Sequence, residues 1–351
     1  MPQIRCLEES RFRQLGSRSL QFWYPVPLAL GSLWRAVFFD KLNRECSIHH
    51  AGYSGFAEGK VETEMRLISY QSETGPRTAV ARGNEGYVDL HKADPLLPTQ
   101  MKQLLPMLSM HREAIQEVAQ TGKLLDPAKT RLLPPVVEPQ KILCIGLNYA
   151  DHAAETGATV GDEPVVFNKF PTCLRADQQP IELPACSSEV DYEAELVVVI
   201  GRSGKNIPQE EALNHVAGYA VGHDVSARDW QKGKPGKQWL LGKSFDSFAP
   251  LGPELVTSDE VEDPHNLRIQ CRLNGETMQD SSTSQLIFRI DYLISYLSQV
   301  CTLVPGDLIY TGTPPGVGVA RKPPVFLKPG DRVEIEIEKL GLLTNPVVAA
   351  T

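Results

Sequence analysis

The acidic segment at residues 189–201 constrains the fold and the chemistry of this chain more than any other stretch. Its second half, residues 197–200, is a β-branched run closed by Gly201, which predicts a buried strand. Glu193 and Glu195 precede that run two residues apart, so a strand would project both from the same face. Adjacent carboxylates at the mouth of an apolar strand repel each other and are costly to desolvate. A divalent cation held by oxygen ligands would compensate for this, and a solvated edge strand is the alternative.

Composition and charge exclude several classes of function. The 351 residues are 42% hydrophobic and 22% charged, which is typical of a globular protein with room for one large domain or two ordinary ones. A net charge of −8, without a stripe of lysine and arginine, argues against a general nucleic-acid binder. Seven scattered cysteines without a C-x-x-C pair indicate neither a disulfide framework nor a zinc site, and favour a reducing compartment. No apolar run approaches the ~18–20 residues of a membrane span.

Residues 1–64 do not share the pattern of the remaining chain. Their apolar patches lack helical or strand periodicity and are interrupted by prolines, so we expect a poorly ordered extension before the true domain. Met65 opens the first regular pattern and is a candidate for the natural start of the protein. Scattered arginines permit an organellar presequence, although Glu8 and Glu9 weaken that interpretation. The sequence therefore predicts a cytoplasmic protein, with an organellar matrix as the alternative.

Short strands and one interrupted helix are predicted after this extension. Apolar residues around a glycine turn indicate two or three strands within residues 65–90. Leucines on one face predict a helix over residues 101–120, which Pro106 divides in two. The proline-rich stretch at residues 132–139 is a stiff linker, and we place a domain boundary there. The resulting division is a small N-terminal α/β region at residues 65–135 and a metal-dependent catalytic domain at residues 136–351.

The chain after the linker is dominated by short strands. Residues 267–276 alternate into Asn274-Gly275, a strong hairpin signal. Residues 304–307 and 328–331 share a Pro-Gly-Asp turn that feeds a strand, and an apolar stripe at residues 290–297 predicts a helix. Further strands are expected at residues 141–146, 165–167, 195–200, 216–223, 308–311 and 332–338. Many strands with few helices predict an α+β, mainly β fold whose antiparallel or mixed sheet closes on itself.

His152 and Glu155 form the first candidate catalytic pair. A strand ends at Gly146 and a short helix follows, which places the two side chains three residues apart on one helical face. A carboxylate beside an imidazole fixes the imidazole tautomer, as a general base requires. The alternative is an exposed helix pair that contributes only a few tenths of a kcal/mol.

Three later segments carry further polar candidates. Asp224 could be a third oxygen ligand, and Arg228 could hold a substrate carboxylate unless it only pairs with its neighbours. Lys243 lies in an apolar stretch and needs an anion, either a substrate enolate or a nearby acid. The loop at residues 311–318, with Thr313, could bind an oxyanion through its backbone N–H groups. It lacks the lysine of a phosphate-binding P-loop, which argues against nucleotide binding.

Five motifs, in this order, resemble the fumarylacetoacetate hydrolase family and in particular its fumarylacetoacetate hydrolase domain-containing members. The resemblance covers residues 65–351 and is strongest over residues 140–348. The motifs are N-Y-x-x-H-x-x-E at 148–155, E-x-E at 193–195, H-D-V-S-A-R-D-W-Q at 223–231, W-L-L-G-K-S-F-D at 239–246 and T-G-T-P-P-G-V-G at 311–318.

The resemblance implies a β-roll catalytic domain that forms a homodimer and binds Mg²⁺, with Mn²⁺ or Ca²⁺ as alternatives. It also implies three groups of site residues. These are the metal ligands Glu193, Glu195 and Asp224, the catalytic residues His152, Glu155 and Lys243, and the substrate-binding residues Arg228, Gln231 and Thr313.

Together these residues favour metal-stabilised enolate chemistry on a 2-oxo acid or 1,3-dicarbonyl substrate. The primary prediction is C–C bond hydrolysis of acylpyruvate-like compounds. In that reaction His152, supported by Glu155, activates water, and the enolate leaves against the metal and Lys243. The alternative is an isomerase, tautomerase or decarboxylase that acts on oxaloacetate or on compounds like 2-hydroxyhepta-2,4-diene-1,7-dioate. The same enolate gives these outcomes when no water attacks.

Overall fold

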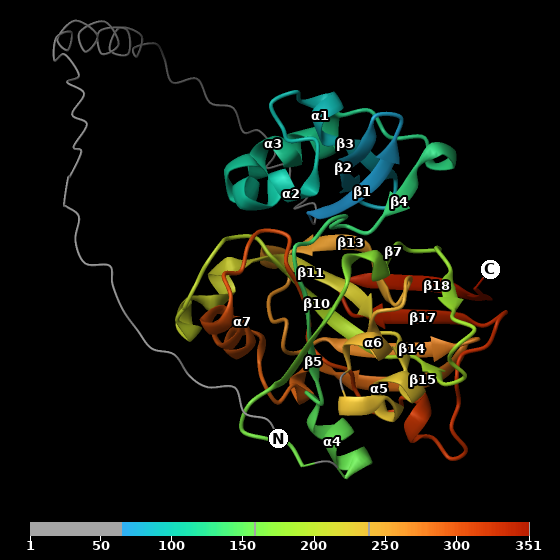
Figure 1. Ribbon diagram of the computed structural model, residues 1–351. Coiled ribbons are helices and arrows are strands. Elements are labelled where there is room, and N and C mark those ends of the chain that lie inside the picture. Colours follow the sequence, from blue (N-terminus) through green and yellow to red (C-terminus); the bar gives the residue numbers. More distant parts are fainter. Residues whose placement is uncertain (1–64, 158, 238, 351) are drawn as a thin grey trace, which may run out of the picture. The chain divides into compact units, whose positions relative to one another are not determined.

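The architecture is α+β and mainly β, as the strand pattern predicts (Figure 1). The computed structural model describes residues 65–157, 159–237 and 239–350. The predictions for residues 1–64, a poorly ordered extension or a presequence, lie outside the described residues. Most of the described strands belong to an eleven-stranded sheet and a five-stranded sheet, and a two-stranded ladder joins β9 (Val190–Asp191) to β12 (Ser226–Ala227).

The eleven-stranded sheet is mixed, and most of its neighbouring strands are antiparallel. Its order is β3-β2-β1-β13-β11-β10-β16-β5-β6, with β4 on β1 and β7 on β13. The strands are β1 (Arg66–Ser72), β2 (Gly75–Arg82), β3 (Gly86–Asp89), β4 (Arg131–Leu133), β5 (Ile142–Gly146), β6 (Val165–Lys169), β7 (Leu174–Arg175), β10 (Ala194–Ile200), β11 (Val216–His223), β13 (Ala249–Thr257) and β16 (Leu308–Tyr310).

The five-stranded sheet packs against the β10, β11 and β13 part of the larger sheet. Its order is β15 (Glu276–Ser282), β14 (Arg268–Leu273), β17 (Arg332–Ile337), β18 (Gly341–Ala349) and β8 (Ile181–Leu183). The predicted hairpin at Asn274-Gly275 joins β14 to β15, and both residues have positive φ values of 53° and 84°. Two successive positive φ angles are what a two-residue hairpin turn requires, so this prediction is confirmed.

The described α-helices are between four and 14 residues long. Figure 1 shows α1 (Leu90–Ala93), α2 (Met101–Leu104) and α3 (Leu108–Thr121) beside β1–β3. The predicted helix at residues 101–120 is indeed divided, because a 3₁₀ turn at Leu105–Met107 carries Pro106. The other helices are α4 (Ala150–Thr156), α5 (Arg228–Gly233), α6 (Leu240–Lys243) and α7 (Ile290–Val300). Further 3₁₀ turns span Pro127–Lys129, Pro171–Cys173, Gln209–His215, Pro235–Lys237, Ser258–Glu260, Thr283–Gln285 and Gly318–Ala320.

Strand β10 is buried along its whole length and separates two hydrophobic clusters. Leu196 and Val198 belong to the cluster that contains Leu293 of α7. Val197 and Val199 belong to the cluster that also contains the core of β1–β3. Burial on both faces explains why this strand reads as a continuous apolar run instead of an alternating one.

The two Pro-Gly-Asp turns share one geometry. Asp307 Oδ2 accepts a hydrogen bond from Val304 N at 2.7 Å, and Asp331 Oδ2 accepts one from Lys328 N at 2.8 Å. Each turn leads directly into a strand, β16 and β17 respectively. The first turn therefore fixes the start of β16, which pairs with β10 beside the acidic segment.

The large sheet continues across the predicted division near residue 135. Strand β1 pairs with β4 and also with β13 of the proposed catalytic domain. The division into residues 65–135 and 136–351 therefore stays a prediction.

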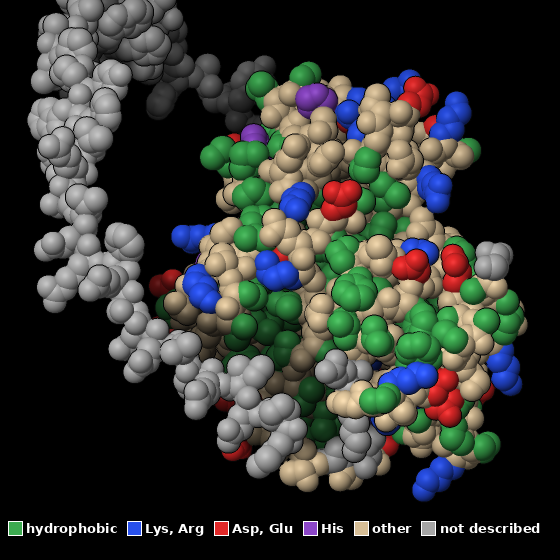
Figure 2. Space-filling view, in the orientation of Figure 1, with side chains coloured by type: hydrophobic (Ala, Val, Ile, Leu, Met, Phe, Trp, Pro, Cys, Tyr) green, Lys and Arg blue, Asp and Glu red, His purple; other side chains and the backbone are tan. Residues whose placement is uncertain are grey.

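Charged side chains of both signs are interspersed over the face shown in Figure 2, without a continuous basic area. Within the described parts of the chain, no helix has the length and apolar character needed to cross a membrane.

Candidate metal centre and active site

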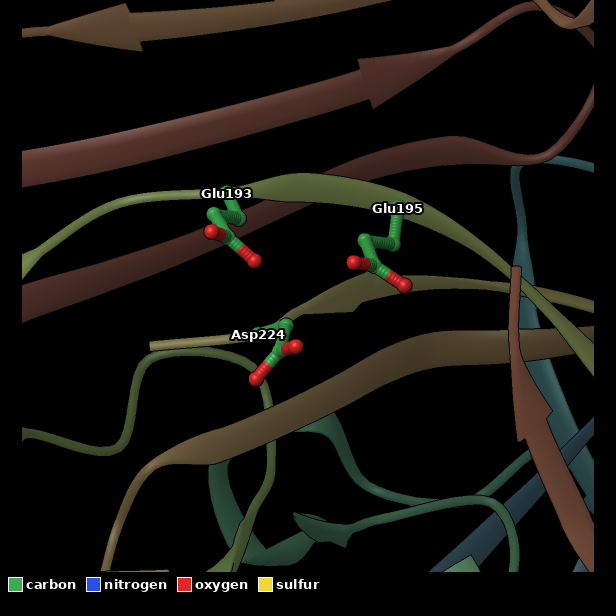
Figure 3. A group of neighbouring side chains, drawn as sticks. All are labelled: Glu193, Glu195 and Asp224. Atoms are coloured by element: carbon green, nitrogen blue, oxygen red, sulfur yellow. The ribbon is translucent and has the colours of Figure 1, made fainter. Parts of the chain in front are cut away.

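The pairing of β10 with β11 brings three distant carboxylates together. The antiparallel register places Ala194 opposite His223, so Asp224 comes opposite Glu193, and Asp224 N donates to Glu193 O at 3.0 Å. Glu193 lies just before β10 and Glu195 lies within it. One carboxylate oxygen from each of Glu193, Glu195 and Asp224 lies within 4.8 Å of the others, and Figure 3 shows the three groups facing one another. The three predicted metal ligands thus share one centre.

The electrostatics of this group fit a hard divalent cation. Burial, together with the negative charges of Asp224 and Glu193, raises the pKa of Glu195 well above its usual value. Burial alone would also raise the pKa of Glu193, but Lys243 and Arg228 lower it well below the usual range. The buried negative charges of Glu193 and Asp224 therefore raise the energy of the ionised form of Glu195. Carboxylate oxygens that converge in this way are the donor set that Mg²⁺ and Mn²⁺ prefer.

Lys243 and Arg228 contact the protein's own carboxylates. Lys243 Nζ donates to Glu193 Oε2 at 2.7 Å and to Asp224 Oδ2 at 2.9 Å, which makes these two acids its partners. Arg228 Nε donates to Asp191 Oδ2 at 2.8 Å, and its Nη2 forms an ion pair with Glu193 Oε1 at 2.6 Å. The interpretation that Arg228 pairs with neighbours is thus the one that its contacts match. Its contact with substrate stays a prediction.

Lys169, at the end of β6, is a site residue that the sequence reasoning missed. Its side chain is buried, and Nζ lies 2.6 Å from Asp224 Oδ1. Nζ also donates to the backbone oxygens of Val225 at 3.1 Å, Phe248 at 2.8 Å and Lys243. The available signal was a lysine at the end of an apolar strand, which is the same argument that singled out Lys243.

His152 and Glu155 form the predicted pair on α4. His152 Nδ1 lies 3.1 Å from Glu155 Oε2, and Gly316 N donates to Glu155 Oε1 at 3.0 Å. The start of α4 is held by Asn148, whose Nδ2 donates to Thr311 O at 2.7 Å. The backbone of the glycine- and proline-rich loop therefore contacts both ends of this helix.

Thr313 and Gln231 also make bonds within the site. Thr313 Oγ1 donates to Ala194 O and accepts from Gln279 Nε2, each at 2.8 Å. Gln231 Oε1 accepts from Arg228 Nη1 at 3.0 Å. These bonds fix the two side chains relative to β10 and Arg228. Their predicted contact with substrate is not tested by these positions.

The backbone N–H groups of the 311–318 loop were predicted to bind an oxyanion. Two of them donate to glutamate side chains of the protein itself. Gly312 N donates to Glu195 Oε2 at 2.9 Å, and Gly316 N donates to Glu155. Hard Mg²⁺ prefers oxygen ligands, which favours a structural role for His223. Burial lowers the pKa of His223 to about 3, so it is neutral near pH 7. A buried neutral imidazole beside two lysines agrees with that role.

A cavity of about 260 Å³ brings these groups to one space. Asp224 lies below its surface and is fully buried, and Glu155 lies behind His152. Apolar side chains form part of the wall, including Phe167 and Trp239, which meet edge to face at 5.3 Å. The cavity is lined by seven of the nine predicted site residues: His152, Glu193, Glu195, Arg228, Gln231, Lys243 and Thr313. A larger cavity of about 620 Å³, lined by α1 and residues 121–126, contains none of the nine.

The chain is similar to several known proteins. The family model described as fumarylacetoacetate (FAA) hydrolase C-terminal matches residues 141–348. Oxaloacetate tautomerase FAHD2B, mitochondrial, of Bos taurus is 51% identical over 292 residues, covering 81% of this chain and 92% of that protein. Oxaloacetate tautomerase fahd2, mitochondrial, of Xenopus laevis is 49% identical over 288 residues, with 81% and 90% covered. The crystal structure of maleylpyruvate hydrolase from Sphingobium sp. SYK-6, in complex with manganese (II) ion and pyruvate, has a TM-score of 0.68 and 31% identity. The match covers 82% of this chain and 100% of the hydrolase chain.

Proposed function

Because the chain belongs to the fumarylacetoacetate hydrolase family, we propose that it is a metal-dependent enzyme that interconverts the keto and enol forms of oxaloacetate. Family membership confirms the resemblance and the β-roll fold predicted from the sequence. The observation that carries the proposal is the identity of about half the residues with oxaloacetate tautomerases, over most of both chains. This favours the alternative reading of the sequence over its primary prediction of C–C bond hydrolysis.

Glu193, Glu195 and Asp224 would hold the cation, with Mg²⁺ as the proposed physiological ion and Mn²⁺ as a substitute. When bound, a divalent ion supplies Lewis-acid stabilisation of the negative charge that develops on a 2-oxo acid. Lys243 contacts Glu193 and Asp224 and lines the cavity. Its ammonium group adds positive charge beside the substrate oxygen on which the negative charge develops.

His152 is the proposed proton carrier. Its Nδ1 is directed at Glu155, so Nε2 is the ring nitrogen that takes a proton from C3 of the keto acid. Returning that proton to the C2 oxygen gives the enol, and no carbon–carbon bond breaks. The apolar wall formed by Phe167 and Trp239 limits the access of water. A general base of this kind contributes on the order of 10²–10⁴-fold to the rate.

Hydrolysis of acylpyruvate-like compounds is the second candidate. The observation that favours it is the similar fold of a maleylpyruvate hydrolase whose crystal structure contains manganese (II) and pyruvate. The two reactions differ in how the enolate is formed. In tautomerisation it arises when C3 loses a proton, whereas in hydrolysis it is released by C–C cleavage after water attacks the remote carbonyl. A proton then completes either reaction.

Keto–enol exchange of oxaloacetate is expected to be accelerated by the metal-loaded protein. Metal-free protein is mixed with Mg²⁺ or Mn²⁺ and oxaloacetate, and the enol absorbance is followed in the ultraviolet. We expect a rate well above that of metal without protein, loss of that rate on adding EDTA, and recovery when excess Mg²⁺ is restored.

The same preparation separates the rival activities. Pyruvate released from oxaloacetate would indicate decarboxylation, and pyruvate released from acylpyruvates would indicate hydrolysis. An enol absorbance that relaxes no faster than in the protein-free mixture at equal metal concentration would contradict the proposal.

We also propose a homodimer, as the resemblance implies. β6 forms one end of the described sheet, and Val165, Val166 and Phe170 are exposed on or beside it. Leu241, on the neighbouring α6, is exposed as well. An apolar strand edge of this kind is suited to burial against a second copy. Light scattering should give the mass of two chains, and a Val166→Asp variant should shift it toward one chain. A wild-type mass of one chain would exclude the dimer.

A mitochondrial location is proposed from the names of the two tautomerases, both of which are described as mitochondrial. Residues 1–64 would then contain a presequence. N-terminal sequencing of the protein recovered from mitochondria would reveal its removal, and an intact Met1 in that fraction would contradict it.

A further inference from the structure

Gly316 connects the catalytic pair to a second set of polar groups. Its N–H donates to both carboxylate oxygens of Glu155, at 3.0 and 3.2 Å. Its carbonyl oxygen accepts from Tyr192 OH at 3.1 Å and from Arg321 Nε at 3.3 Å. Tyr192 and Arg321 therefore hold the carbonyl group of Gly316, while its N–H group orients Glu155.

Arg321 makes this connection without pairing with an acid in the described part of the chain. Its Nε donates to Tyr192 OH at 3.1 Å as well as to Gly316 O, and its Nη2 donates to Met278 O at 2.8 Å. All three partners are neutral. The guanidinium thus ties the loop to the backbone of β15, which an arginine fork does better than a single-point donor.

The backbone at Gly316 leaves little freedom for other arrangements. Its φ angle is +100°, and a Cβ atom there would lie 2.1 Å from Met278 O. The loop therefore lies directly against β15, in a conformation that favours glycine. The direction of the Gly316 N–H, and with it the position of the Glu155 carboxylate, depends on how the residue is held against that strand.

We propose that Arg321 is a positioning residue for proton transfer: by holding Gly316 against β15 it orients Glu155, and through Glu155 it sets the tautomer and direction of His152. The inference rests on the proposed function for its kinetic test, because His152 is the proton carrier of that proposal. Among the described residues, Arg321 neither bonds to a proposed metal ligand nor lines the cavity, so we expect its removal to act through the dyad.

The variant Arg321→Met keeps the apolar length of the side chain and removes its donors. We expect kcat for keto–enol exchange to fall by about 10-fold, which is part of the contribution of a general base. We expect KM and the Kd for Mn²⁺, measured by calorimetry, to stay within about twofold, because no cavity or metal contact is lost. Arg321→Lys retains one donor and should recover part of kcat.

A double-mutant cycle with Glu155→Gln distinguishes positioning from a general structural effect. If Arg321 acts through Glu155, the loss caused by Arg321→Met should be much smaller in the Glu155→Gln background. Additive losses, or a fall in Mn²⁺ affinity parallel to kcat, would overturn the inference. Arg268→Met, which removes an exposed arginine paired with Asp280 on the same sheet, is the matched control and should leave kcat unchanged.

A spectroscopic measurement gives a readout that does not depend on turnover. In protein labelled with ¹⁵N-histidine, the His152 ring signals are assigned from their loss in His152→Gln. Arg321→Met should shift them toward averaged tautomers, whereas Arg268→Met should not. Shifted signals without oxaloacetate turnover by the wild type would overturn the proposed function and leave the positioning role intact. Unchanged signals and unchanged kcat in Arg321→Met, with an active wild type, would overturn the positioning role alone.

Discussion

Replacing Glu195 with glutamine is expected to abolish Mn²⁺ and Mg²⁺ binding without destabilising the metal-free protein. The substitution removes one of three converging carboxylates, yet the amide oxygen of the new side chain can still accept the bond that Gly312 N donates to Glu195. Loss of Lewis-acid stabilisation worth several kcal/mol should lower kcat by about 1,000-fold. Calorimetric titration with Mn²⁺ and the oxaloacetate assay measure the two effects.

Asp224→Asn is the matched comparison, because it likewise replaces one of the three converging carboxyl groups with an amide. Asp224 faces Lys169 at 2.6 Å and Lys243 at 2.9 Å, so its neutralisation leaves two buried cations short of a partner. Breaking a buried pair in this way typically costs about 3–5 kcal/mol of stability. We therefore expect both variants to lose metal binding, but only Asp224→Asn to unfold at clearly lower denaturant concentration. Equal stability of the two metal-free variants would contradict this view of the site.

The raised pKa of Glu195 also predicts how the stability of the metal-free protein depends on pH. In the unfolded chain this carboxyl releases its proton near its usual pKa of 4.5, whereas burial and the negative charges of Asp224 and Glu193 raise its pKa well above that value in the fold. The folded state then binds more protons, so stability falls as pH rises above that value. Glu195→Gln lacks this titration. Its free energy of unfolding relative to the wild type should therefore increase as the pH rises above 4.5, and other groups largely cancel in the difference.

At the carboxylate centre, only the local part of the structure could be predicted from the residues themselves. The E-x-E spacing and the apolar run predicted a strand with two carboxylates on one face, and that local part needs only strand periodicity. The convergence of Asp224 depends on the register of β10 against β11, which a single sequence does not specify. The family resemblance supplied that link, as it did for the β-roll, whereas the His152–Glu155 pair followed from helical spacing.

The partners of the buried cations could not be predicted, because pairing is decided in space and not along the chain. Arg228 finds Asp191, 37 residues away, and Lys243 finds Glu193, 50 residues away. Lys169 was missed for the same reason: its partners come from three separate segments that meet only after the sheet has formed. Predictable parts of the site are those fixed within one strand, one helix or one turn.

Lys169→Met is expected to be among the most destabilising single substitutions in the catalytic region, by about 3–5 kcal/mol. The side chain is fully buried, and its ammonium satisfies three backbone carbonyls besides the Asp224 carboxylate. Methionine fills a similar volume but supplies no donor, so three carbonyl oxygens lose a hydrogen bond and Asp224 loses an ion pair. Urea denaturation of the metal-free protein measures the loss.

Lys243→Met tests whether the carbonyls, and not only the charge, account for that effect. Lys243 is equally buried and holds Glu193 and Asp224, both of which are proposed metal ligands. A divalent cation can therefore replace its charge, and saturating Mn²⁺ should restore most of the stability that Lys243→Met loses. It should restore much less in Lys169→Met, because a cation at the carboxylate centre cannot donate to the backbone oxygens of Val225 and Phe248. Full recovery of Lys169→Met by Mn²⁺ would mean that Lys169 serves only as a counter-charge to Asp224. In that case the three carbonyl bonds would contribute little to holding the metal-bearing segments together.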